Sequence, residues 1–250
     1  MSKQDVYKVF DSVEANVSCA DMYAVLALLV QFPTPELAQG LAGGALQADV
    51  AAIAGELGID AQAVRDLVDA FDAACKGDAG ASFAGEVADA GSLYEAMRRE
   101  RTRLFDHPDQ PAVRIYEAQF LYELARERGE EHKTGMLADM PQMFVNNAAL
   151  DAERCYRAAG LVRDIQVNVP GDCMFTELEF MAHLHTCKAR ALNEGDAQAA
   201  AQVEAQIQEF ARIHVARWFP AFFDALTLQA HGPYRLTGVL GALFMRAVLA

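Results

Sequence analysis

The stretch ELEFMAHLH places two carboxylates and two imidazoles within nine residues, at Glu177, Glu179, His183 and His185. Carboxylate-bridged metal sites in helical bundles use a Glu-x-x-His spacing, which puts acid and imidazole on one helix face, and they use it twice. Here the spacing from Glu179 to His183 is four, and the chain has no second copy. His183 and His185 would point about 200° apart on a helix. We therefore expect a Glu179–His183 pair, a partly buried His185 and no bound metal.

A second group with chemical potential is Cys173, with Asp172 before it and His183 further along. These are the residue types of a nucleophile, an acid and a base, but no motif such as G-x-S-x-G holds them together. The start of a helix would lower the pKa of Cys173, whereas an unactivated cysteine is more often a packing residue. Gly-rich phosphate cradles are absent, so no cofactor is expected. We expect no enzyme, and a helical-bundle enzyme stays as a less favoured alternative.

Four arginines lie within six residues of MRRERTRLF, at 97–105. In a strongly acidic chain they are typical of a solvated helix face paired with Glu95 and Glu100. Arg101 differs, because it follows Met97 by four residues and therefore falls on the apolar stripe of the helix. An arginine there needs an acidic partner or a ligand.

The elements that position these residues are helices, since apolar residues recur at helical spacing, Ala is abundant and alternating Val/Ile/Thr runs are missing. We expect an all-α fold, with residues 1–250 in a single helical-bundle-like domain of about ten to twelve helices and two loosely distinguished halves. The expected helices cover about 4–15, 19–31, 34–43, 46–57, 60–75, 83–104, 112–128, 136–158, 173–193, 196–218, 220–230 and 234–249.

Several turn residues mark the boundaries of these helices. Pro33 and Pro35 separate the second helix from the third, and Asp60 is placed to cap the fifth. Pro220 and the HGP triplet at 231–233 are expected to break the last segments.

The polar run ARERGEEHKTG at 125–135 lies near the middle of the chain. It is the best candidate for a hinge between the two halves, and an ordinary surface loop explains it about equally well. A hinge would allow protomers to exchange halves, so both a monomer and a domain-swapped homodimer fit this pattern.

The turn NVPGD precedes the acidic helix of the opening paragraph. Pro170 and Gly171 are expected to make the turn, and Asp172 to accept backbone N–H bonds as the N-cap of that helix. An alternative start uses Thr176 and Glu179 as a capping box.

Composition limits the classes of partner. Lys and Arg total 21 against 35 Asp and Glu, a formal charge of −14 that disfavours nucleic acid and anionic lipid. The five widely spaced cysteines form no C-x-x-C motif, so neither a disulfide framework nor a zinc ribbon is expected. The first residues have no apolar signal core, and the longest apolar run, MYAVLALLV at 22–30, is short for a membrane span. We expect a cytoplasmic protein.

Three separated segments together resemble the TorD/DmsD-type family of cytoplasmic chaperones, which mature twin-arginine-exported molybdenum oxidoreductases. The first is LYEAMRRERTRLFDHPDQPAVRIYEAQF at 93–120, and the second is VPGDCMFTELEFMAHL at 169–184. The third, FARIHVARWFPAFFDAL at 210–226, is similar to a His-x-x-x-Trp-x-Pro helix end. The chain departs from the family pattern where Arg101 replaces a Tyr, Val169 a Glu and Cys173 a His.

This resemblance implies a chaperone that binds the apo-precursor of a molybdopterin-containing oxidoreductase through its basic and apolar signal peptide. The client-binding residues that it implies are Arg101, Leu104, Phe105, Tyr116, Glu117, Pro170, Asp172, Cys173 and Glu177. For Leu104 and Phe105 plain core packing is the commoner role, as it is for Trp218, Phe222 and Phe223. A nitrate-reductase-type assembly chaperone, whose client is not exported, is the alternative within this class.

Overall fold

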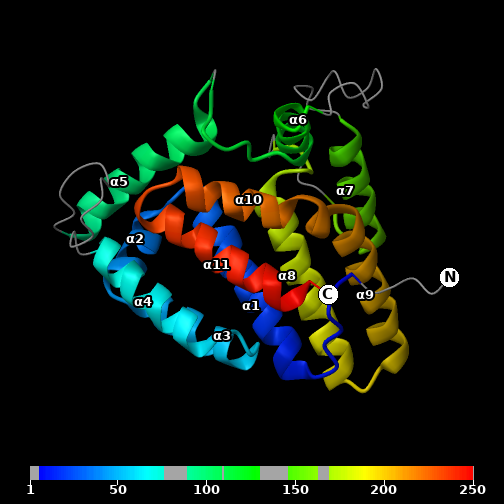
Figure 1. Ribbon diagram of the computed structural model, residues 1–250. Helices are drawn as coiled ribbons and strands as arrows, with labels where there is room; N and C mark the ends of the chain where they lie inside the picture. The colour runs from blue at the N-terminus through cyan, green and yellow to red at the C-terminus, as the bar shows by residue number, and fades with distance from the viewer. Residues whose placement is uncertain (1–5, 76–88, 109, 130–145, 163–168, 250) are drawn as a thin grey trace.

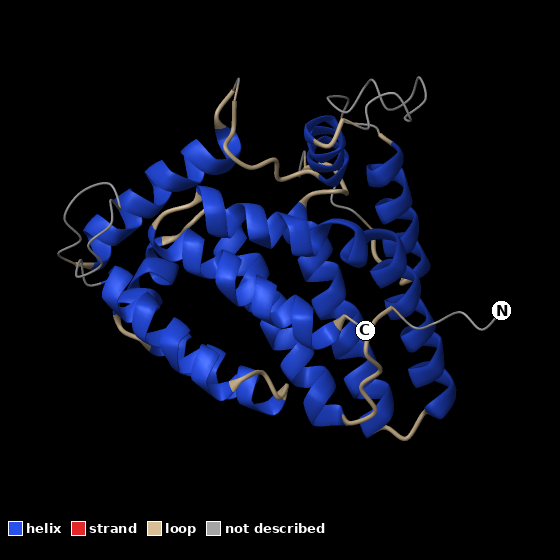
Figure 2. Cartoon of the chain, viewed as in Figure 1, coloured by secondary structure: helices blue, strands red, loops and turns tan. Residues whose placement is uncertain are grey.

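The computed structural model describes residues 6–75, 89–108, 110–129, 146–162 and 169–249. Helices and loops account for this part of the chain, as Figure 2 shows, and the expected all-α class is confirmed. The α-helices are α1 (Val13–Val30), α2 (Pro35–Ala42), α3 (Ala45–Glu56), α4 (Ala61–Cys75), α5 (Ala90–Arg101), α6 (Glu117–Glu127), α7 (Asn147–Ala158), α8 (Met174–Asn193), α9 (Ala197–Phe210), α10 (Ala216–Gln229) and α11 (Gly232–Val248). Two π-helical turns, η1 (Thr102–Asp106) and η3 (Ala211–Val215), extend α5 and join α9 to α10.

Helices from both ends of the sequence build the centre of the molecule. α1 packs along α8, and α11 packs on α10, α4 and α1 (Figure 1). α2 to α5 lie at one end of this centre, whereas α6 and α7 lie together at the other. One continuous hydrophobic core therefore joins the N-terminal and C-terminal parts of the chain.

Local sequence explains most of the helix starts. Asp60 accepts a hydrogen bond from the Ala63 amide at 2.7 Å, so the predicted cap of α4 is confirmed. Thr34 caps α2, and Pro35 occupies its first turn, where a missing N–H costs nothing. The other side-chain caps are Ser12 for α1, Asp89 for α5, Asn146 for α7 and Asp196 for α9.

Three expected helix bounds are wrong. The helix expected from 112 begins only at Glu117, because Tyr116 pairs with Cys173 in an antiparallel bridge and residues 112–116 are not helical. Residues 6–12 are not helical, because Tyr7 pairs with Leu249 in an antiparallel bridge and the Lys8 amide bonds the Val248 carbonyl at 2.8 Å. Pro220 does not break the chain into two helices, and instead lies inside α10. Pro220 is the fifth residue of α10. Its neighbours Trp218, Phe219, Phe222 and Phe223 are buried, and their packing outweighs the helix hydrogen bond that Pro220 cannot donate.

The proposed hinge at 125–135 falls mostly outside the described residues. Within them, α6 continues to Glu127, and Gly129 then adopts a left-handed conformation with φ +69°. The hinge and the exchange of halves stay predictions.

α1 is the one helix in the described ranges that is long and apolar enough to cross a membrane by length and composition. However, 56% of this window is buried inside the fold. α1 has the burial expected of a central core helix.

Candidate functional site

The chain segments that precede α6 and α8 lie side by side. Tyr116 and Cys173 form an isolated antiparallel bridge. The Glu117 amide donates to the Asp172 carbonyl at 2.9 Å, and the Met174 amide donates to the Ile115 carbonyl at 2.9 Å. This pairing fixes the first turns of two helices from separate sequence segments against each other. We call the surrounding polar cluster, Glu117, Asp172, Glu177, His214 and Trp218, the acidic junction.

Asp172 caps a different helix from the one expected. Its Oδ2 accepts from the Ala118 amide in the first turn of α6 at 3.2 Å, and from Asn146 Nδ2 at 3.1 Å. The N-cap of α8 is Cys173, which makes no capping bond through its side chain. The prediction was wrong because the fold brings the start of α6, which has no cap of its own, next to Asp172.

The Asp172 carboxyl is buried, and this burial is the main cause that raises its pKa.

The alternative capping box is wrong as well, since α8 has already begun at Met174. Thr176 is therefore inside the helix. Glu179 accepts a hydrogen bond from Gln31 and not from a helix-start amide.

Two fully buried carboxylates meet at one imidazole in the acidic junction. His214 Nδ1 donates to Glu117 Oε2 at 2.6 Å and lies 3.7 Å from Glu177 Oε1. Trp218 Nε1 donates to Glu177 Oε2 at 2.9 Å. Burial, followed by the charge of Glu117, holds the pKa of Glu177 well above its usual range. The junction is thus a low-dielectric site where negative charge is incompletely compensated.

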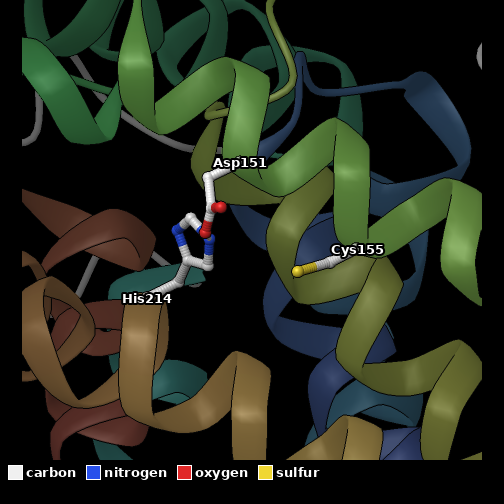
Figure 3. Close-up of side chains that lie close together, drawn as sticks. All are labelled: Asp151, Cys155 and His214. Atoms are coloured by element: carbon white, nitrogen blue, oxygen red, sulfur yellow. Dashed lines mark ion pairs between the residues drawn. The ribbon is translucent and has the colours of Figure 1, made fainter.

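Two charged side chains on the outer side of the acidic junction, Arg217 and Asp151, approach Glu117 and His214. Arg217 Nη1 lies 3.7 Å from Glu117 Oε1, and the Arg217 side chain is 57% exposed. On the other side of the imidazole, His214 Nε2 lies 3.4 Å from Asp151 Oδ2 (Figure 3). The imidazole therefore lies between an inner and an outer carboxylate.

Arg101, the arginine expected on the apolar stripe, is buried and has the acidic partner that its position requires. Its Nη1 is 2.7 Å from Asp106 Oδ2, and its Nε donates to the carbonyl of Val30, the last residue of α1, at 3.1 Å. The guanidinium carbon lies 4.6 Å from the centre of the Phe105 ring. Arg101 therefore fixes η1 to the end of α1.

The remaining predicted site residues are mostly core residues. Leu104 and Phe105 are buried, and Phe105 stacks on Phe222 with ring centres 6.1 Å apart. Pro170 and Cys173 are buried in the turn before α8. Core packing of Trp218, Phe222 and Phe223 is confirmed, since all three are fully buried.

The residues considered for an enzyme or for a metal do not converge. His183 approaches Cys187 Sγ at 3.5 Å, so the Glu179–His183 pair is not formed. His185 is fully buried, where partial burial was expected, because Tyr7 and Asn16 enclose it. Burial raises the pKa of the Cys173 thiol and opposes the thiolate that a nucleophile needs. No disulfide links the described cysteines.

The predicted pairing of the arginine-rich helix is confirmed. Arg98 lies 3.4 Å from Glu95, and Arg103 lies 2.6 Å from Glu100. Glu100 also accepts from the His231 amide at 2.8 Å.

Comparison with known proteins bears directly on this site. A family model described as nitrate reductase delta subunit matches residues 59–224, well over half of the chain. The chain belongs to this family. The match includes every residue of the acidic junction, and the family is one of chaperone-type assembly factors for molybdoenzymes rather than a catalytic family. The expected kinship with the TorD/DmsD-type chaperones is confirmed at this level. No curated protein matches the chain.

Sequence reasoning did not assign His214, Trp218, Asp151 or Cys155 to a site. His214 and Trp218 are part of a family-like segment, but nothing in their spacing indicates that His214 would meet Glu117. Asp151 and Cys155 have only an i, i+4 spacing on one helix, which is too common to single them out.

Proposed function

We propose that this protein is a cytoplasmic, client-specific chaperone. It would bind the apo-precursor of a molybdopterin-containing oxidoreductase through a signal peptide or terminal segment, and hold it until the cofactor is inserted. One observation carries the proposal: three sequence segments that resemble chaperone signatures meet at the acidic junction, inside the part of the chain that the family match covers.

The chemistry of the junction suits a cationic segment. Glu117 Oε1, Glu177 Oε1 and Asp172 Oδ1 are buried and have no hydrogen-bond partner among the described residues. A guanidinium carries several donors in a planar fork that matches carboxylates. The net charge of −14 would steer a basic peptide toward the protein before contact.

Access to the junction would require α6 to move. Only Glu117 and Phe120 of the eleven residues of α6 are fully buried, and Leu121 and Leu124 pack partly buried against the core. Fewer buried contacts therefore oppose the displacement of α6 than hold the central helices α1 and α8. In this proposal the opened junction offers Tyr116, Glu117, Pro170, Asp172, Cys173 and Glu177 to the basic part of the client. Leu104 and Phe105, on the neighbouring turn with Arg101, would meet the apolar part of the client after the same displacement.

A nitrate-reductase-type client that stays in the cytoplasm is the second candidate. The description of the matching family favours it. The two candidates differ in whether the bound client segment carries a twin-arginine signal.

A peptide titration tests the proposal. We expect a fluorescent twin-arginine signal peptide to bind the purified protein, with an affinity that falls as salt increases and with weaker binding after both arginines are changed to lysine. Glu177→Gln should weaken binding by roughly ten- to a hundredfold, because a charge-assisted hydrogen bond is worth about 1.5–3 kcal/mol.

Glu56→Gln is the matched control, since it makes the same substitution at an exposed position on α3. Equal loss of affinity in both variants would reduce the effect to net charge. No binding of either peptide by the wild-type protein would refute signal-peptide recognition and leave the non-exported client as the remaining candidate.

A further inference from the structure

A second cluster lies on the outer side of His214, facing away from Glu117. Asp151 and Cys155 are one turn apart on α7, and their side chains point toward the imidazole from η3 (Figure 3). Three possible ligand atoms lie within 4.8 Å of one another: a carboxylate oxygen of Asp151, Sγ of Cys155 and a ring nitrogen of His214. Carboxylate, thiolate and imidazole are the three ligand types that proteins use for zinc.

The hydrogen bonds of His214 leave one nitrogen available for a ligand. Nδ1 donates to Glu117 at 2.6 Å, which leaves the lone pair of a neutral imidazole on Nε2. Nε2 has no hydrogen-bond partner among the described residues, although the His214 side chain is only 1% exposed. A carboxylate that orients a histidine in this way is the usual second partner of a metal-bound imidazole.

Asp151 presents its oxygen in a complementary way. Arg154 holds Oδ1 through two hydrogen bonds of 3.0 and 2.8 Å, so the carboxylate orientation is set. Oδ2 is buried, lacks a hydrogen-bond partner in the described structure and faces His214 Nε2 at 3.4 Å. Two lone-pair-bearing atoms that face each other repel unless a cation or a proton lies between them.

The separation of these two atoms fits a metal ion. With bond lengths of about 2.0–2.1 Å and tetrahedral angles, two light ligand atoms of one zinc ion lie about 3.3 Å apart. The observed 3.4 Å is close to this value and long for a well-formed N–H···O bond. The two facing atoms are buried, but the Asp151 side chain as a whole is 31% exposed, so the site lies just beneath the protein surface.

We propose that His214 Nε2, Asp151 Oδ2 and Cys155 Sγ bind a zinc-like divalent ion. Sγ would lose its thiol proton to solvent as the metal–sulfur bond forms, and a water molecule would complete four-coordination. The ion would link α7 to η3 next to the acidic junction. Two of the three ligands, Asp151 and Cys155, lie outside the segments that carry the family resemblance, and the metal site does not depend on any client.

Metal titration of the purified full-length protein tests the site. We expect one Zn²⁺ per chain to bind in competition with a chromophoric chelator. Co²⁺ should give the near-ultraviolet thiolate-to-cobalt charge-transfer band together with the visible bands of tetrahedral cobalt. Cys155→Ala should abolish the charge-transfer band and weaken Zn²⁺ binding by at least about tenfold. Asp151→Asn should weaken Zn²⁺ binding while keeping the band.

Cys187→Ala is the matched control, because Cys187 is also partly buried and has His183 one turn away on α8. It should leave both the affinity and the cobalt spectrum unchanged. Thermal melts of the metal-free variants verify that each one folds. Absence of saturable Zn²⁺ binding, or binding that survives Cys155→Ala and is lost in Cys187→Ala, overturns the proposal. If a proton between His214 Nε2 and Asp151 Oδ2 takes the place of the ion, no saturable Zn²⁺ binding is expected.

Discussion

At the scale of single residues, buried polar groups connect parts of this chain that are far apart in sequence. Asp172 holds the start of α6 and the Asn146 side chain at the start of α7, while its own segment leads into α8. Removing its carboxylate leaves a backbone donor and an amide without an acceptor in a buried place, which costs more than the loss of an exposed cap.

We predict that Asp172→Ala lowers the free energy of unfolding by roughly 2–3 kcal/mol. The exposed cap variant Asp60→Ala should lower it by about 1 kcal/mol. Denaturant unfolding measures both values. Hydrogen exchange then locates the effect, because the Ala118 amide should lose protection first. Loss of protection confined to the first turn of α8 would contradict this assignment.

His185 is held in its neutral form by a fixed chain of hydrogen bonds. Asn16 donates to the carbonyls of Phe10 and Ser12 at 2.8 Å, so its oxygen must accept from His185 Nδ1 at 2.9 Å. Nε2 then accepts from the Tyr7 hydroxyl at 3.0 Å. Burial, followed by the charge of Lys188, lowers the pKa of His185 from 6.5 to about 3.

We predict a pH-dependent loss of stability from this histidine. The unfolded chain takes up the proton near pH 6.5, whereas the folded chain does so only near pH 3. The stabilisation is therefore complete above pH 6.5 and is lost as pH falls, by up to about 1.4 kcal/mol per pH unit. His185→Gln should flatten the unfolding free energy against pH over this window. Parallel curves for the two proteins would contradict the prediction.

Residue types in the sequence indicated which side chains needed partners, but seldom which partners they have. The need of Arg101 for an acid followed from its place on an apolar stripe, and Asp106 lies only five residues away. The partner of Asp172 could not be inferred from the sequence. The local pattern indicates α8, which follows Asp172 in the chain, but not α6, which lies beside it in the fold. The meeting of His214 with Glu117, 97 residues apart, depends on the whole fold.

At the scale of helices, the departures from regular geometry coincide with the segments that carry the site. η1 contains Leu104 and Phe105, and η3 contains His214. Each π-helical turn changes the direction in which the following residues point, and such turns are frequent at functional sites. Apolar periodicity predicted helices in both places, but it carries no signal for a π-helical turn.

The contact between α10 and α11 depends on two glycines. A Cβ added at Gly241 would lie 2.2 Å from the Phe223 ring, and one at Gly238 would lie 2.5 Å from the Thr227 amide nitrogen. The two helices therefore approach more closely than any larger residue permits.

We predict that Gly238→Ala destabilises the protein by roughly 1–3 kcal/mol, because the obstacle is backbone that cannot move aside. Gly55→Ala is the control, since it lies in α3 with nothing within 4 Å of the added Cβ. It should stabilise the protein by up to about 1 kcal/mol. Thermal unfolding of both variants measures the difference. Similar changes in the two variants would show that the α10–α11 approach is not tight.

At the scale of the whole molecule, composition and periodicity predicted the all-α class and most of the helices. Helix class and approximate helix position follow from the spacing of apolar residues, and each segment carries that spacing in its own sequence. The non-helical segment 6–12 was missed because contacts with the C-terminus decide it. The uninterrupted α10 was missed because it depends on the packing of the buried aromatic residues around Pro220.

The central claim is that this family member holds one immature molybdoenzyme subunit. The most direct measurement is affinity capture with the tagged protein, expressed in its own organism. The cells are grown anaerobically, and the proteins that elute with the bait are identified by mass spectrometry. A Glu177→Gln bait provides the matched comparison. We expect one molybdopterin-enzyme catalytic subunit, free of cofactor, to be enriched by the wild-type bait and reduced with the variant. Recovery of no such subunit, under growth that induces these enzymes, would contradict the account.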